Sequence, residues 1–129
     1  MHSFDLLPAN FDTFRAAYLE AALMTATDGD EDNWSPNVDD LAPSTAQAIA
    51  DECAAFLTSA VNAGLLTDEH LSQAGCDYLL TRNGHGAGYW DRPETYGEQQ
   101  AAQLTTLADS TGGRDLYRGD DGLVYQSIA

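Results

Sequence analysis

The sequence contains no lysine, and its only basic residues, apart from three histidines, are five arginines in 129 residues. Aspartate and glutamate number 21, so the formal net charge is −16 at pH 7. Contacts with nucleic-acid phosphates and with anionic membranes both depend on cationic side chains. The shortage of cations therefore argues against direct binding to nucleic acid or to a membrane. It favours a basic protein partner, reached by electrostatic steering. The alternative is that the acidic residues support solubility, or that the composition reflects a GC-rich or salt-adapted host that avoids lysine.

Cysteine and long apolar runs are also scarce. The two thiols, Cys53 and Cys76, are expected to be reduced and buried, with a disulfide between them as the less favoured alternative. No apolar run approaches the roughly 18 residues that a membrane helix needs. Asp5 stands where a signal peptide would carry basic residues, so we expect no secretion signal and a cytoplasmic location.

What is present is enough apolar sequence, 43% of the residues, for one domain spanning 1–129. Apolar residues at helical spacing predict helices from 11 to about 25–27, 44 or 45 to about 63, 67 to about 75, and 93 or 94 to 109. Strand-forming residues and turn signals predict strands at 78–81, 89–90, 115–118 and 123–126. The expected fold is α+β: three to four helices packed on a small antiparallel sheet of about four short strands, with a C-terminal β-hairpin.

Residues 79–92 form a glycine-rich segment, Leu-Leu-Thr-Arg-Asn-Gly-His-Gly-Ala-Gly-Tyr-Trp-Asp-Arg. Its alternating glycines could present backbone N–H groups to an anion, with Arg82, Asn83, His85 and Arg92 as the binding side chains. The segment is no Walker loop, because the chain has no lysine, and it lacks the dinucleotide-binding spacing. Glycines in such a pattern more often permit a tight turn. We therefore expect a fold-defining turn first and a ligand site second.

His85 is the natural candidate for a catalytic group. The run His-Gly-Ala-Gly resembles the oxyanion loop of lipases, but the Gly-x-Ser-x-Gly nucleophile elbow is missing. His85 could also act as a general base oriented by Asp77 or Asp91. A histidine in such a setting more often ties a loop together through hydrogen bonds. The sequence therefore favours a protein that is not an enzyme and holds no cofactor.

The acidic segment 28–40 is a candidate calcium-binding loop. Asp28, Asp30 and Asp32 occupy the first, third and fifth places of an EF-hand loop. The sixth place has Asn33 in place of glycine and the twelfth has Asp39 in place of glutamate, with a proline between them. The histidines and cysteines show no zinc spacing. No metal is therefore expected, and the segment is interpreted as a solvated acidic loop.

Three aromatic residues, Trp34, Tyr89 and Trp90, suit either an interface or a core. We expect Trp90 to be buried and Trp34 to be half-buried.

The stretch from Leu80 to Arg92 resembles the shared motif of a family of small acidic proteins encoded by tailed bacteriophages and prophages. The likeness extends loosely to Phe11–Leu23, to residues 34–43 and to residues 115–125. It implies a phage or mobile-element origin and a location in the host cytoplasm. It implies no mechanism and supplies no catalytic residues.

These observations favour a non-enzymatic accessory protein that binds a basic host protein, including the DNA-binding kind, through an acidic surface. The surface would be built from the first two helices and the 28–40 loop, with Asp28, Asp30, Asp32 and Trp34 among its contacts. In the most specific version of this hypothesis, the carboxylates of the surface mimic DNA phosphates. The alternative is a small-anion or enzymatic site at residues 82–92.

Overall fold

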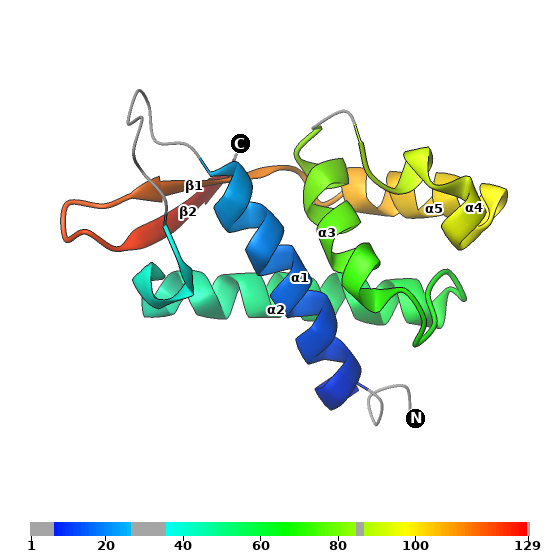
Figure 1. The fold of residues 1–129 in the computed structure, drawn as a ribbon, viewed down its shortest axis with the longest axis horizontal. Helices are drawn as coiled ribbons and strands as arrows, with labels where there is room; N and C mark the ends of the chain where they lie inside the picture. The colour runs from blue at the N-terminus through cyan, green and yellow to red at the C-terminus, as the bar shows by residue number, and fades with distance from the viewer. Residues whose placement is uncertain (1–6, 27–35, 85–86, 129) are drawn as a thin grey trace.

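A computed structural model of the chain describes residues 7–26, 36–84 and 87–128. Five α-helices, two short 3₁₀ turns and two strands follow one another in these residues (Figure 1). They are α1 (Leu7–Thr25), η2 (Val38–Asp40), α2 (Pro43–Asn62), α3 (Leu71–Arg82), η3 (Tyr89–Asp91), α4 (Pro93–Tyr96), α5 (Glu98–Asp109), β1 (Arg114–Arg118) and β2 (Val124–Ile128).

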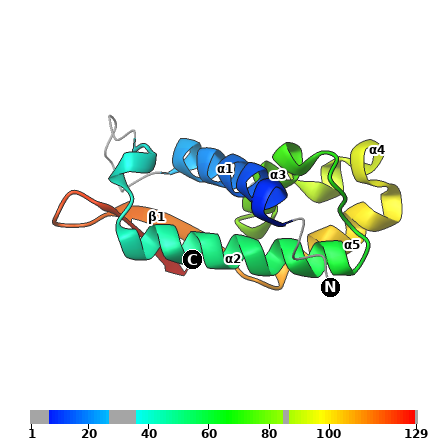
Figure 2. The same cartoon turned by 90° about the horizontal axis from the view of Figure 1, so that it is seen from below.

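The helices form two layers. Helices α1 and α3 lie on one side and α2 lies on the other, as Figure 2 shows from below. The β-hairpin and the α4–α5 pair extend to opposite ends of the molecule (Figures 1 and 2). Helix α4 therefore sits far from the tip of the hairpin.

Stacked aromatic rings form the centre of the core. The Phe56 ring lies 4.0 Å from the Tyr78 ring and 6.0 Å from the rings of Phe14 and Tyr89, measured between centroids. All four side chains are at most 2% exposed. Each such pair adds about 0.5–1.5 kcal/mol beyond the burial of its area. The stack thus joins α1, α2, α3 and η3 into one body.

The sheet differs from the prediction. The described residues contain a single two-stranded antiparallel sheet, paired from Arg114 with Ile128 to Arg118 with Val124. The predicted C-terminal hairpin is thus confirmed, whereas the predicted strands at 78–81 and 89–90 are wrong. The first is the end of α3, and the second is the turn η3.

Helical burial explains why 78–81 is not a strand. Eight of the twelve residues of α3 are buried, and they include a series that recurs every three or four residues, as helical packing requires: Leu71, Ala74, Tyr78 and Arg82. This packing against α1 and α2 overrides the β-propensity of residues 78–81, which depends strongly on context. The predicted helix that ends near residue 75 therefore continues to Arg82.

The remaining helices were predicted with errors at their ends. Helix α1 begins at Leu7, ahead of the predicted start, and α2 begins at Pro43, a residue favoured at the first helical position. The single helix predicted from 93 or 94 to 109 is two helices, because Gly97 adopts φ +97° between α4 and α5. In the described part of the chain, none of these helices combines the length and apolarity needed to cross a membrane.

Both thiols are free. Cys53 is fully buried, as expected, whereas Cys76 is only partly buried on α3. Burial raises the pKa of the Cys53 thiol to about 12.

Candidate functional site

Arg82, the first cation of the glycine-rich segment, is buried at the C-terminal end of α3. Its Nε donates to the Gly112 carbonyl at 2.8 Å, and one terminal nitrogen donates to the Tyr18 hydroxyl at 3.0 Å and to Glu52 at 2.9 Å. The other terminal nitrogen reaches the Thr111 carbonyl at 3.4 Å. All three guanidinium nitrogens therefore bind acceptors of the protein itself.

Glu52 of α2 is the second centre of this group. Its other carboxylate oxygen accepts from Arg114 Nε of β1 at 3.3 Å and from Gln126 Nε2 of β2 at 3.2 Å. We call Tyr18, Glu52, Arg82, Arg114 and Gln126 the Arg82 cluster. It joins α1, α2 and α3 to both strands of the hairpin, so its geometry supports a structural role.

Asn83 extends the same attachment. Its side-chain amide donates to the Arg114 carbonyl at 2.9 Å, and its amide oxygen accepts from the Arg114 N–H at 2.8 Å. This paired bond holds the start of β1 at the end of α3. Asn83, one of the predicted binding residues, is thus engaged within the fold.

Arg92, the second cation of the segment, belongs to a different group. It forms an ion pair with Asp77 on α3, with 3.0 Å between Nε and Oδ1. Asp77 is fully buried and also accepts from Tyr96 at 2.7 Å and from Gln73 at 3.1 Å. Burial, followed by the bond to Asp77, raises the pKa of the Tyr96 hydroxyl well above its usual range. We call Gln73, Asp77, Arg92 and Tyr96 the Asp77 cluster.

The turn between the two clusters closes on α3. Gly88 has φ +141°, and an added Cβ there would collide with the Thr81 hydroxyl. The same hydroxyl accepts from the Tyr89 N–H at 3.0 Å, and the Tyr89 hydroxyl donates to the Ala74 carbonyl at 2.7 Å. Glycine at 88 is therefore required by a close approach, as the fold-defining interpretation expects.

The predicted anion site is not assembled as expected in the described residues. Arg82 and Arg92 belong to separate clusters, where each donates to groups of the protein. His85 and Gly86 lie outside the described residues. Sequence reasoning missed the partners Glu52 and Tyr96, and it considered Asp77 as an orienter of His85 and not as the partner of Arg92. An unpaired acid within an apolar helical stretch, as at Asp77, is the signal that could have found that pair.

One part of the glycine-rich segment faces solvent. Trp90 is 52% exposed, against the prediction that it is buried, and Asp91 beside it is exposed too. The buried ring of this aromatic pair is Tyr89, at 0% exposure. Tyr89 stacks on Phe56 and donates its hydroxyl to the Ala74 carbonyl, so it is the ring of the pair that packs in the core.

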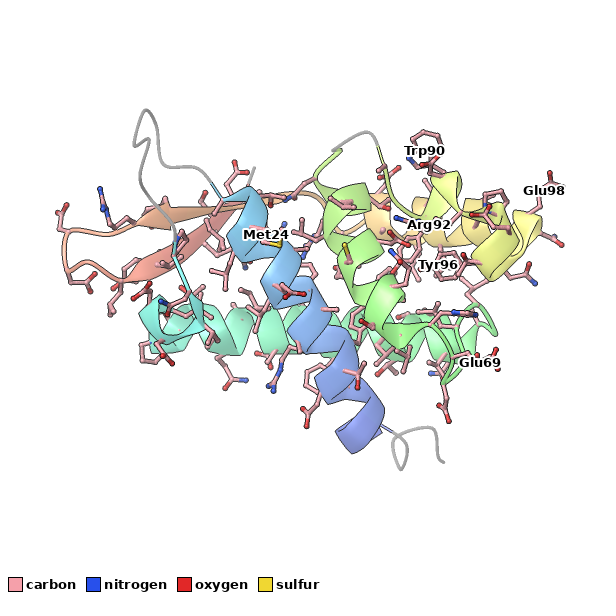
Figure 3. The ribbon with its side chains drawn as sticks, in the orientation of Figure 1. Met24, Glu69, Trp90, Arg92, Tyr96 and Glu98 are labelled. Atoms are coloured by element: carbon pink, nitrogen blue, oxygen red, sulfur yellow. The ribbon has the colours of Figure 1, made fainter. Side chains whose placement is uncertain are left out.

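The other predicted binding residues, Asp28, Asp30, Asp32 and Trp34, lie outside the described residues. Within the residues that are described, no group of three His, Cys, Asp or Glu side chains could hold a metal ion. An apolar groove of about 530 Å³ lies between α1 and residues 36–38. Met24, 79% exposed and labelled in Figure 3, and Val38, 56% exposed, are among the residues that line it.

Comparison of the chain with protein-family models, with curated proteins and with solved structures gave no significant match.

Proposed function

We propose that this chain is a non-enzymatic accessory protein of a phage or mobile element that binds a basic host protein in the cytoplasm through its acidic surface. The observation that carries the proposal is the sign of the exposed charge. Among the described residues, thirteen acidic side chains are exposed, but only one arginine, Arg118. The acidic ones are Asp12, Glu20, Asp39, Asp51, Asp68, Glu69, Asp91, Glu94, Glu98, Asp109, Asp115, Asp120 and Asp121.

The surface is this acidic because the fold uses its few cations internally. Arg82 and Arg114 pair with Glu52, and Arg92 pairs with buried Asp77. Their charges therefore do little to offset the exposed carboxylates. A surface field of one sign attracts a partner of the opposite sign and accelerates association. Carboxylates at this density can replace the DNA phosphates in a basic groove.

Exposed apolar groups within this acidic surface favour a protein as the partner. Met24 and Val38 line the groove beside α1, and Trp90 stands on η3, well apart from Met24 (Figure 3). Protein interfaces typically combine a few apolar or aromatic anchors with a polar rim.

The alternative, a small-anion or enzymatic site at residues 82–92, has less support. It requires Arg82 to face a ligand, and Arg82 is 5% exposed with every guanidinium nitrogen donating to the protein. Releasing it would leave Glu52 without its closest cation.

The proposal is tested by capture of partners from a bacterial lysate on the immobilised chain at two salt concentrations. The screening length falls from about 10 Å at 0.1 M to about 3 Å at 1 M ionic strength. We expect a basic protein that is retained at the lower concentration and released at the higher. Double-stranded DNA should compete for that protein if the carboxylates act as phosphate mimics.

A charge-reduced variant gives the control. Asp12→Asn, Glu20→Gln, Asp39→Asn and Asp51→Asn together remove four exposed negative charges from α1, η2 and α2. Weaker capture by this variant supports the proposal. Finding no salt-sensitive basic partner would remove its basis.

A further inference from the structure

We infer that the Asn83–Gly84 pair is a site of spontaneous deamidation, and that the attachment of the hairpin to α3 controls how fast it reacts. Of the five asparagines in the chain, Asn83 alone is followed by glycine. A glycine nitrogen is the backbone nitrogen least shielded by its own residue, because glycine has no Cβ. The side chain of Asn83 is therefore the one most open to attack by the chain itself.

The reaction exchanges one amide bond for another and ends in hydrolysis. The Gly84 nitrogen attacks Cγ of Asn83, a new C–N bond forms, and the bond from Cγ to Nδ2 breaks. Nδ2 leaves as ammonia with the proton that the Gly84 nitrogen gives up. Water then opens the cyclic imide at either of its carbonyl carbons, which gives aspartate or isoaspartate at position 83. Water is the only co-reactant, and nothing is oxidised or reduced.

In the folded chain, hydrogen bonds occupy both groups that must react. The Gly84 N–H donates to the Thr81 carbonyl at 3.1 Å. In the side chain of Asn83, Nδ2 donates to the Arg114 carbonyl at 2.9 Å, and Oδ1 accepts from the Arg114 N–H at 2.8 Å. The attacking nitrogen and the amide under attack are thus held by different partners. All three bonds oppose the approach of one group to the other.

The backbone angle at Asn83 also holds the two groups apart. Asn83 ends α3 with ψ −1°, which turns the Gly84 nitrogen towards the nitrogen of Asn83 itself. Closure of the imide ring requires the Gly84 nitrogen to lie on the side of Cβ, so the bond between Cα and the carbonyl carbon must rotate. That rotation takes the Gly84 N–H away from the Thr81 carbonyl. The folded structure therefore protects Asn83 through its backbone as well as its side chain.

The hairpin is the part of this arrangement that can open locally. Its two strands belong to no larger sheet in the described residues, and a two-stranded hairpin is marginal without further packing. Local opening of such an element requires less free energy than global unfolding. Departure of β1 takes the Arg114 backbone away from Asn83 and frees both polar atoms of its amide. The rate of deamidation therefore follows the fraction of molecules in which the hairpin is detached.

The product weakens the contact that protected the site. Aspartate or isoaspartate carries a carboxylate, which accepts from the Arg114 N–H but has no proton to donate to the Arg114 carbonyl. Isoaspartate also adds a methylene group to the main chain at the end of α3. Because the ammonia has left, refolding does not restore the amide. Each modified molecule therefore keeps a loosened hairpin.

The test follows the full chain at mildly alkaline pH and measures aspartate and isoaspartate at position 83 by peptide mapping and mass spectrometry. We expect the folded parent to react at least about tenfold more slowly than the parent unfolded in urea. Leu116→Ala truncates a hairpin side chain that is 7% exposed and should raise the rate of the folded chain at least about tenfold. In urea the variant and the parent should react at the same rate, since the sequence around Asn83 is unchanged.

Leu104→Ala is the matched control, because Leu104 is fully buried on α5 and is not part of the hairpin. We expect it to leave the rate of the folded chain within about twofold of the parent. If circular dichroism shows that either alanine variant does not fold, Leu116→Val and Leu104→Val take their places. Leu116→Val should then accelerate the reaction about threefold, and Leu104→Val should not.

Equal acceleration by the two leucine variants would overturn the inference, because global unfolding would then control the reaction. Equal rates for the parent in buffer and in urea would also overturn it, because the fold would then give no protection. A parent that stays unmodified in urea would show that the pair itself is unreactive, with the same consequence. None of these results bears on the capture of a basic partner, which depends on the acidic surface.

Discussion

Arg82 shows how a residue that looks like a ligand-binding cation can serve the fold. Its side chain is 1% exposed, and its guanidinium also lies over the Tyr78 ring, 4.8 Å from the centroid. The planar guanidinium holds its N–H donors in a fixed arrangement, so this one side chain can donate to a carboxylate, a hydroxyl and carbonyls together. Removing it takes this donor from the Gly112 carbonyl and the Tyr18 hydroxyl, whereas Glu52 and the Thr111 carbonyl still accept from Arg114.

We therefore expect Arg82→Met to lower the free energy of unfolding by about 3 kcal/mol, the lower end of the cost of breaking a buried ion pair. The lower end applies because Glu52 keeps Arg114 and some contact with solvent. Arg15→Met is the matched control, since Arg15 pairs with Asp12 on the surface of α1 and should cost less than about 1 kcal/mol. Urea unfolding measures both, and equal losses would contradict the buried role.

Among the elements, the hairpin depends on α3 for its position. Strands β1 and β2 form a two-stranded sheet, which is marginal in water without further packing. Leu116 and Val124 supply that packing from one face, at 7% and 1% exposure. The paired bond between Asn83 and the Arg114 backbone fixes where β1 begins.

Asn83→Ala should therefore loosen the hairpin more than the helices. The loss of two hydrogen bonds predicts a destabilisation of about 2 kcal/mol. Amide hydrogen exchange should accelerate in β1 and β2, with α2 changed less. Asn83→Asp retains the acceptor for the Arg114 N–H and loses the donor, so its effect should be intermediate. Uniform acceleration across the chain would contradict a local attachment.

At the scale of the whole molecule, ionisable groups are divided by sign and by depth. Most carboxylates are exposed, and three of the arginines pair with acidic residues of the fold. The weakly acidic side chains of Cys53, Tyr18 and Tyr89 are buried. Burial raises the pKa of the thiol of Cys53 from 9.0 to about 12 and also raises the pKa of the Tyr18 and Tyr89 hydroxyls. The folded state thus holds these protons more tightly than the unfolded chain does.

The sign of the pH dependence follows from these raised pKa values. Below about pH 9 the Cys53 thiol is protonated in both states, so its contribution to stability is fully present. Above that pH the unfolded thiol ionises first, and stability falls as the pH rises through about 12. One such group lowers the free energy of unfolding by at most about 1.4 kcal/mol per pH unit.

We therefore expect Cys53→Ala to flatten the fall in stability between about pH 9 and pH 10, below the ordinary range of tyrosine ionisation. Cys76→Ala is the control, because Cys76 is only partly buried and should change the slope less. Urea unfolding at each pH gives the slope. An unchanged slope in Cys53→Ala would show that another group governs alkaline unfolding.

Local patterns predicted α1, α2 and the hairpin well, because each is specified by residues close together in the chain. Apolar spacing and a following glycine at 64 identify α2, and the turn residues 119–122 identify the hairpin. The same reasoning failed at 78–81, where strand propensity and helical burial disagree. It also placed the wrong ring of Tyr89 and Trp90 in the core, since the sequence holds no record of which ring meets Phe56.

The sequence by itself determined the charge, the absence of lysine and the fold-defining character of the glycine-rich segment. These depend on composition and on local backbone geometry, neither of which requires contacts between residues far apart in the chain. Only the tertiary structure decided the roles of the arginines and of Trp90. Arg82 meets Glu52, and Arg92 meets Asp77, across 30 and 15 residues of chain respectively. These contacts between distant positions pair the arginines with internal carboxylates, so the exposed surface remains acidic. The packing of the fold also leaves the Trp90 indole exposed.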